Sequence, residues 1–296
     1  MKELVVISGK GGTGKTSIAA AFASLAQKAV VADCDVDAAD LHLVLSPTIR
    51  QRYDFSGGKQ ATIISEKCIG CGKCVKMCRF EAINLDGPAN GLIDKTYRVD
   101  PVSCEGCKVC VEFCPVNAID FEDTINGQWF VSDTRFGPMV HAKLGIAEEN
   151  SGKLVTLIRR EAKRIAEEQK KDLLIIDGSP GIGCPVIASI TGSDLVLVVT
   201  EPTLSGKHDL ERVAQLTANF GIKTLVCINK ADINPEMSRN IAKDAKNKGL
   251  KVIGEIPYDE AFTKAQIMKA TLIEYTSGDI ADKVKALWRE VVYALG

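Results

Sequence analysis

The sequence predicts an α/β fold, a mostly parallel sheet covered by helices on both faces, into which a small α+β domain is inserted. Short apolar runs alternate with helical stretches in both outer parts of the chain, which is typical of a parallel sheet buried on both sides. A glycine-rich loop directly follows the first apolar run. Between the outer parts lies a cysteine-rich segment without a long helical or strand period. The 296 residues are enough for two ordinary domains.

The main domain is predicted from these periods, element by element. Strands are expected at 4–7, 29–32, 173–176, 195–199, 225–228 and 252–256, with a short strand at 129–131 where the chain returns from the insert. Helices are expected at 16–27, 153–170, 207–218, 235–248 and 259–269, and the apolar positions of 280–291 predict a last helix that packs on the core. The domain boundaries follow as 1–62 and 123–296 for the main domain and 63–122 for the insert.

The composition gives no reason to expect a nucleic-acid or membrane partner. The formal net charge is −1, and basic residues are interleaved with acidic ones. No apolar run is long enough to span a membrane, and no export signal precedes the first strand. We therefore expect a soluble cytoplasmic protein. Dense cysteines in such a protein indicate metal ligands rather than disulfides.

Residues 9–16, Gly-Lys-Gly-Gly-Thr-Gly-Lys-Thr, match the phosphate-binding pattern G-x-x-x-x-G-K-[ST]. An apolar strand precedes this loop and a helix follows it, so backbone N–H groups and the helix N-terminus can surround phosphate oxygens. Lys15 is expected to contact the β- and γ-phosphates, and the Thr16 hydroxyl to bind Mg²⁺.

Two acidic strand ends complete the predicted phosphate site. Asp177 follows the apolar run 173–176, as a Mg²⁺-associated aspartate does in such folds, and Asp35 follows the second strand, where it can orient water or the metal. For Asp35 a turn or capping role stays open. The neighbouring Asp33, Asp37 and Asp40 are interpreted as ordinary polar residues.

The early lysine, Lys10, makes the loop resemble that of the MinD/ParA/nitrogenase iron-protein class of P-loop ATPases, over residues 1–45 and 127–296. The resemblance implies a P-loop NTPase fold, an ATPase that is slow without a partner, and a nucleotide-dependent homodimer in which Lys10 reaches the partner's phosphates. It also implies that 33–35 and 177–181 are the two switch segments. The implied catalytic residues are Lys10, Lys15, Asp35 and Asp177.

The base site is predicted less directly. Residues 229–232, Asn-Lys-Ala-Asp, match the N-K-x-D guanine pattern, but the resemblance favours ATP or ADP, with Asn229 and Pro257 beside adenine. The candidate nucleotide-binding residues are Gly9, Lys10, Gly11, Gly12, Thr13, Gly14, Lys15, Thr16, Ser17, Asn229 and Pro257.

Eight of the eleven cysteines form two runs with the same spacing, C-x-x-C-x-x-C-x-x-x-C. This resembles the bacterial two-cluster ferredoxins, in which the fourth cysteine of each run binds the other cluster. One [4Fe–4S] cluster is assigned to Cys68, Cys71, Cys74 and Cys114, and the second to Cys104, Cys107, Cys110 and Cys78. Two four-cysteine zinc sites are the alternative. Arg79 follows the first run where Pro115 follows the second.

Together, the motifs resemble the family of MinD-type ATPases with an inserted ferredoxin domain. This implies an iron–sulfur ATPase that couples its nucleotide state to electron transfer toward a redox partner. A scaffold for iron–sulfur or metallocofactor assembly and a ParA-like positioning ATPase with redox-sensing clusters are alternatives. The segments 134–138 and 148–153 resemble family segments, and either loop roles or a partner surface would explain them.

Overall fold

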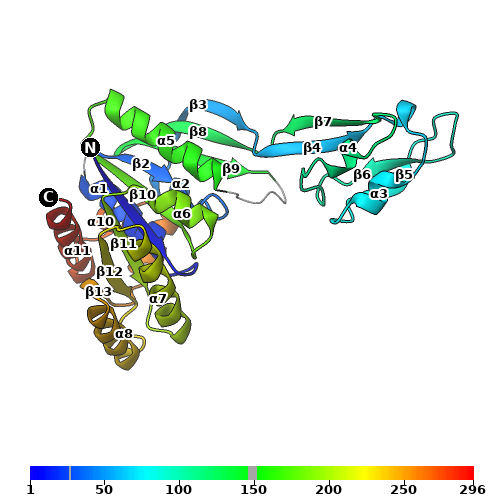
Figure 1. The fold of residues 1–296 in the computed structure, drawn as a ribbon. Helices are drawn as coiled ribbons and strands as arrows, with labels where there is room; N and C mark the ends of the chain where they lie inside the picture. Colours follow the sequence, from blue (N-terminus) through cyan, green and yellow to red (C-terminus); the bar gives the residue numbers. More distant parts are fainter. Residues whose placement is uncertain (27, 146–151) are drawn as a thin grey trace. The chain divides into compact units, whose positions relative to one another are not determined.

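The computed structural model describes residues 1–26, 28–145 and 152–296, and the chain divides into two compact units (Figure 1). The larger unit comprises Met1–Tyr53, Trp129–Lys143 and Asn150–Gly296. The smaller unit comprises Asp54–Gln128 and Leu144–Glu149. The predicted insert boundaries, 62/63 and 122/123, fall inside strands of the smaller unit, which begins and ends several residues further out.

The main sheet is nine-stranded, with the order β13-β12-β11-β1-β10-β2-β9-β8-β3. The strand bounds are β1 Lys2–Ser8, β2 Val30–Asp33, β3 Thr48–Phe55, β8 Gly127–Thr134, β9 Gly137–Leu144, β10 Leu173–Pro180, β11 Leu195–Thr200, β12 Thr224–Asn229 and β13 Lys251–Ile256. Every pairing from β13 to β9 is parallel. The carboxyl ends of the central strands therefore meet at one edge, where polar residues can converge.

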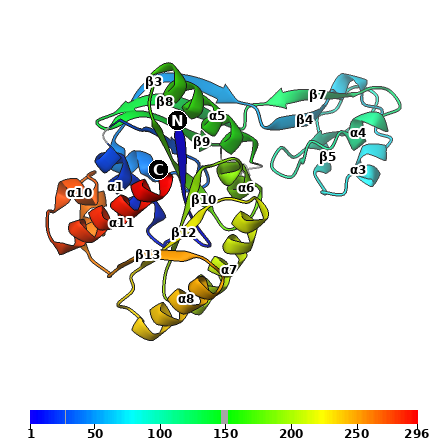
Figure 2. The same cartoon turned by 60° about the vertical axis from the view of Figure 1, so that its left-hand side comes forward.

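Helices cover both faces of this sheet, as predicted (Figure 2). Their bounds are α1 Lys15–Ala26, α2 Leu41–Leu45, α5 Lys153–Glu168, α6 Cys184–Ile190, α7 Leu204–Asn219, α8 Pro235–Asn247, α9 Ala261–Ile267, α10 Leu272–Tyr275 and α11 Asp279–Leu295. Helices α1 and α11 pack on one face through buried residues such as Phe22 and Leu287, and α5 to α8 cover the other. None of the described helices has the length and apolar character needed to cross a membrane.

The sequence prediction did not include β3, α2, α6 and α10, and it differs from the structure at two further places in the larger unit. The short strand expected at 129–131 is part of a hairpin, β8 and β9, whose second strand pairs with β2. Polar residues at the turn and Pro138 hid this hairpin from the apolar pattern. The helix expected at 259–269 is shorter, because Asp259 accepts a hydrogen bond from the Ala261 N–H before α9 begins.

The smaller unit is built from short elements around a small core. Strands β4 Gly58–Ile63 and β7 Ile119–Thr124 pair antiparallel, as do β5 Ile83–Gly87 and β6 Thr96–Val99. Helices α3 Lys73–Met77 and α4 Val109–Glu112 are one turn long, and a 3₁₀ turn covers Ser65–Lys67. Among the described residues its main buried cluster consists of Ala61, Cys74, Ile83, Val99, Cys110 and Ile119, with partly buried residues such as Phe121 packed against it. So few apolar side chains supply little of the burial that a domain needs.

The smaller unit is an internal repeat with an offset of 36 residues. Left-handed backbone conformations at Gly70, Gly72 and Glu81 recur at Gly106, Lys108 and Asn117. The strand before each run pairs with the strand after the other run, since β4 pairs with β7 and β6 with β5. The two halves are therefore interleaved, which brings the end of each cysteine run toward the other run.

Candidate nucleotide site and cysteine cavities

The glycine loop connects β1 to α1, as expected. Gly12 and Gly14 have φ values of 78° and 89°, in the left-handed region that other residues rarely adopt. A Cβ atom at Gly14 would also lie 2.4 Å from the amide nitrogen of Asn229. The loop is thus fixed by two separate requirements, backbone conformation and close contact with the end of β12.

Lys15, the first residue of α1, is buried among the predicted acids. Its Nζ lies 2.6 Å from Asp177 Oδ1, 3.2 Å from Asp35 Oδ2 and 3.2 Å from the Thr16 hydroxyl. Burial alone lowers the pKa of Lys15, but the charges of Asp177 and Asp35 outweigh it, so that the pKa lies above its ordinary value. Lys15 therefore stays charged where phosphate binding requires a cation.

Asp33 is not the ordinary polar residue that the sequence predicts. It is fully buried at the end of β2, in register with Asp177 on β10. Burial, followed by the charge of Asp177, raises its pKa well above the usual value. An excess of three carboxylates over one lysine is the charge pattern that a divalent cation would relieve.

Four buried side-chain atoms of the described residues have no hydrogen-bond partner: Thr13 Oγ1, Asp33 Oδ2, Asp177 Oδ2 and Asn229 Oδ1. All four belong to residues of the glycine loop or of strands β2, β10 and β12. Leaving a buried polar group unpaired costs about 1–3 kcal/mol. Their gathering at one place indicates a site whose polar partners come from a ligand.

A cleft of about 370 Å³ is lined by the glycine loop and Asp35, here called its phosphate end, and by residues at and after the ends of β12 and β13, here called its base end. Its size is in the range of sites for small molecules. The base end is lined by Asn229, Lys230, Pro257, Tyr258, Phe262 and Gln266. Of these, the sequence prediction named Asn229 and Pro257 as base-site residues and did not name the others. Their positions shortly after the predicted strands 225–228 and 252–256 were the only indication in the sequence that they belong to the site.

The residues of the N-K-x-D motif have separate tasks. The Asn229 amide donates to the Thr13 carbonyl at 2.8 Å, and Lys230 Nζ donates to the Gly12 carbonyl at 2.9 Å. Asp232 Oδ1 accepts a hydrogen bond from the Tyr258 N–H at 2.6 Å. The first two residues thus hold the glycine loop, and the aspartate holds the loop after β13.

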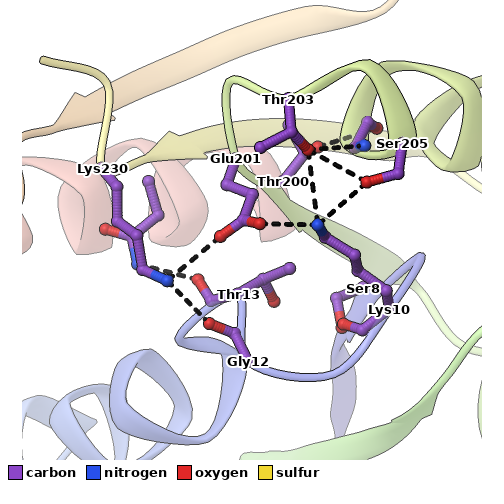
Figure 3. A network of polar contacts seen from close by, with 11 residues as sticks. Ser8, Lys10, Gly12, Thr13, Thr200, Glu201, Thr203, Ser205 and Lys230 are labelled. Carbon is purple, nitrogen blue, oxygen red and sulfur yellow. Dashed lines mark hydrogen bonds and ion pairs between the residues drawn. The ribbon is translucent and has the colours of Figure 1, made fainter. Parts of the chain in front are cut away.

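Lys10 does not face solvent freely in this chain. Its Nζ lies 2.7 Å from Glu201 Oε1 and 3.0 Å from the Ser205 hydroxyl (Figure 3). Gly9 and Gly11 flank it in the loop, and Ser17 on α1 accepts a hydrogen bond from Gln266. The sequence prediction did not include Glu201, because its contact with Lys10 joins residues far apart in the chain.

The eight predicted cysteine ligands line two cavities in the smaller unit. One is lined by Cys68, Cys71, Cys74 and Cys114, together with apolar residues. The other is lined by Cys78, Cys104, Cys107 and Cys110. Each cavity thus receives three cysteines from one run and the last cysteine from the other run, as the interleaved strands require.

Each cavity is lined by four cysteine thiols. Burial, with smaller contributions from Cys68 and Cys71, raises the pKa of Cys74 to about 11. The backbone N–H of Ala118 lies 3.2 Å from Cys114 Sγ. Within the described residues, no three His, Cys, Asp or Glu side chains are grouped so as to hold a single metal ion.

The segments 134–138 and 148–153, for which the sequence left the role open, can be placed in the structure only in part. Thr134 to Pro138 includes the β8–β9 turn, and Arg135 donates to Glu274 Oε2 at 2.7 Å and to the Leu45 carbonyl at 2.7 Å. This segment therefore connects α2 with α10. Of 148–153, residues 148–151 lie outside the described part of the chain. The three cysteines outside the two runs are expected from the sequence to be small buried residues, which is correct for Cys34 and Cys227 and wrong for Cys184, which is exposed.

A phosphate loop between the first strand and the first helix, beside acidic strand ends and a base cleft, defines a P-loop ATPase. The nucleotide-binding domain model of the CobQ/CobB/MinD/ParA family matches residues 4–272, and the chain belongs to this family.

Relatives and solved structures agree with this class. The chain is 33% identical over 292 residues to an uncharacterized protein of Methanocaldococcus jannaschii, which covers 98% of this chain and 96% of that protein. The cell division ATPase MinD of Pyrococcus furiosus has a TM-score of 0.57 at 16% identity, covering 99% of this chain and 98% of that chain. MinD of Pyrococcus horikoshii, complexed with Mg-ADP, has a TM-score of 0.58 at 16% identity, with 98% and 95% covered. At these identities the structural likeness concerns the fold.

Proposed function

We propose that this ATPase carries two [4Fe–4S] clusters and couples its nucleotide state to electron transfer. The observation that carries the proposal is the composition of the two cavities, each lined by three cysteines of one run and one of the other. This is the ligand pattern of two-cluster ferredoxins. When bound, such clusters supply reversible one-electron transfer.

The exchange of the fourth cysteine between the two runs favours clusters over zinc. A zinc site needs only four cysteines around one ion and does not require the same spacing in two runs. In two-cluster ferredoxins three cysteines of each run bind one cluster and the fourth binds the other, which matches the distribution of the cysteines over the two cavities. Metal ligation would also compensate for the small apolar core of this unit.

At the phosphate end, each residue has a task that its position supports. Lys15 would exchange part of its contact with Asp177 and Asp35 for the β- and γ-phosphate oxygens. Thr16 and Asp177 would hold Mg²⁺, which would neutralise phosphate charge when bound. Asp35, at the cleft wall, would orient the attacking water.

The base end favours adenine over guanine. In N-K-x-D sites the aspartate accepts hydrogen bonds from the guanine edge, but here Asp232 accepts one from the Tyr258 N–H and is not among the described residues that line the cleft. The base would then be read mainly by backbone groups near Pro257 and by apolar contact with Phe262.

Coupling has a continuous path along the chain. Strand β9, which follows the smaller unit through β8, pairs with β2, and β2 leads directly to Asp35. A shift of the Asp35 segment on nucleotide binding would therefore act on the strands that carry the smaller unit. We further propose that the ATP-bound form is a homodimer and that a redox protein is the electron partner.

The test is anaerobic purification, iron analysis and EPR, followed by electron transfer to a reporter protein with ADP or with a non-hydrolysable ATP analogue. We expect about eight iron atoms per chain, about four in Cys110→Ser, and no change in Cys184→Ser, whose cysteine lies outside both cavities. The two nucleotides should give different transfer rates. Zinc in place of iron would contradict the cluster assignment, and equal rates would contradict coupling. Net iron transfer to an apo-protein would favour the assembly scaffold.

A further inference from the structure

Glu201, the residue directly after β11, connects two lysines of the nucleotide site (Figure 3). Its Oε1 lies 2.7 Å from Lys10 Nζ and its Oε2 lies 3.1 Å from Lys230 Nζ. The Glu201 side chain is 14% exposed. Burial alone raises its pKa, but the hydrogen bonds and charges of the two lysines outweigh it, and the pKa lies below the usual value. We call this pair of contacts the Glu201 bridge.

The position of Lys10 depends on this bridge. Apart from Glu201, its ammonium contacts the hydroxyls of Thr203, at 3.4 Å, and Ser205, at 3.0 Å. Thr203 is the N-cap of α7 and Ser205 belongs to its first turn. The N-terminus of a helix carries partial positive charge and disfavours a cation. Glu201 therefore supplies the negative charge that keeps Lys10 at this place.

The other end of the bridge lies at the nucleotide cleft. Lys230 has a φ of 56°, a left-handed conformation that is unfavourable for a lysine. Its Nζ contacts both Glu201 and the Gly12 carbonyl of the glycine loop, and both Lys230 and Gly12 line the cleft. A ligand that moves the loop or Lys230 therefore alters the charge around Glu201.

We propose that Glu201 is a positioning residue that holds Lys10 on its own chain and releases it when nucleotide fills the cleft. An ammonium paired with Glu201 of its own chain is not available to the phosphates of a second chain, so the pair must open before Lys10 can contact them. A triphosphate carries more negative charge than one carboxylate and can compete for the lysine. The holding step stands on the contacts described, whereas the release step rests on the proposed nucleotide-dependent dimer.

The holding step is tested by labelling surface lysines of the full-length protein with an amine-reactive reagent, read by mass spectrometry. In Glu201→Gln we expect Lys10 to react about fivefold faster than in the wild-type protein, while exposed Lys28 serves as an internal reference. Glu255→Gln, an exposed site on β13, is the charge-matched control and should leave Lys10 unchanged. Glu201→Asp should restore part of the protection. An unchanged Lys10 rate in Glu201→Gln would overturn the proposal.

The release step is tested by dimer formation against the concentration of a non-hydrolysable ATP analogue with Mg²⁺. Glu201→Gln should dimerise at a severalfold lower concentration, and this gain should vanish in the Glu201→Gln/Lys10→Met double variant, because coupled residues are not additive. An equal gain with and without Lys10 would overturn the role of Glu201 through Lys10. If no variant dimerises, the proposed dimer and the release step are wrong, and the labelling result still decides the holding step.

Discussion

The two units of the chain are stabilised in different ways. In the larger unit, buried aliphatic residues of β1, β10 and β11 pack against α1 and α11, and the polar site lies at the strand ends. In the smaller unit, cysteines are themselves core residues, since Cys74 and Cys110 belong to its buried cluster. The larger unit should therefore fold without its ligand, whereas the smaller unit should depend on its metal.

The largest expected effect is the loss of the smaller unit when its metal is removed. In Cys74→Ser/Cys110→Ser, or after anaerobic chelation, amide exchange in β4 and β7 should accelerate by a factor of about one hundred or more, because metal binding supplies much of the folding free energy. Amides of β1 and β10 should keep their protection, and ATP should still bind. Cys184→Ser is the matched control. Equal loss in both units would contradict the comparison.

Removing the charge of Lys15 should weaken ATP binding by the larger unit and leave the iron content of the smaller unit unchanged. Lys15→Gln removes the cation that is expected to contact the phosphates and leaves the charges of Asp177 and Asp35 uncompensated. Losing a hydrogen bond between charged groups costs about 1.5–3 kcal/mol, or roughly ten- to hundredfold in ATP affinity. The iron content should not change. Calorimetric titration with ATP and an iron assay check this, with exposed Lys28→Gln as control. A simultaneous loss of iron would show that the two sites are not separable.

Lowering the pH should destabilise the larger unit, because it contains a buried histidine. Burial, with a smaller contribution from His42, lowers the pKa of His141 to about 4, and its Nε2 lies 2.9 Å from the Ser132 hydroxyl. In the unfolded chain the pKa is about 6.5. Between these values only the unfolded chain binds the proton, so stability is complete above about pH 6.5 and falls as the pH approaches 4.

Urea denaturation followed by tryptophan fluorescence measures this effect, because both tryptophans belong to the larger unit. From pH 7.5 to pH 5 we expect a loss of about 2 kcal/mol in the wild-type protein that is largely absent in His141→Gln. His208, whose side chain is 68% exposed, provides the control substitution His208→Gln. The same pH dependence in His141→Gln as in the wild type would contradict the assignment to His141.

The smallest effect concerns the internal repeat of the smaller unit. Lys108 occupies the left-handed position that Gly72 occupies in the first half, with φ values of 67° and 69°. Lys108→Gly should therefore stabilise the iron-loaded unit by up to about 1 kcal/mol, although the gain is partly offset because glycine is more flexible in the unfolded chain. Gly72→Ala should destabilise it by a similar amount. Exchange rates of β4 amides measure both, and destabilisation by Lys108→Gly would refute the equivalence of the two positions.

The features predicted from the sequence are those encoded within short, continuous segments of the chain. The glycine loop, the acids after the apolar runs and the two cysteine runs each lie within a short segment. The resemblance to ferredoxins assigned Cys114 and Cys78 to the cluster of the other run, and each lines the cavity of that other run. The predicted mostly parallel sheet and its covering helices are confirmed.

The features that the sequence did not predict depend on contacts between distant segments. Glu201 is a candidate site residue only because it pairs with Lys10, almost two hundred residues away in the chain. Asp33 differs from an ordinary acid only because β10 places Asp177 beside it. Asp232 was recognisable as part of a guanine motif, but its hydrogen bond to the Tyr258 N–H requires the neighbouring strand β13.

The way the chain enters and leaves the smaller unit has a consequence for its origin and its use. The Asn126 N–H donates to the Phe55 carbonyl at 2.8 Å, and its side chain accepts from the Gly57 N–H at 2.8 Å. Entry and exit are thus adjacent, so a tight turn between β3 and β8 could replace everything from Gly58 to Thr124. A module attached in this manner can be gained, exchanged or excised as a cassette, and a shortened protein of this kind would retain the parallel strands that form the ATP cleft.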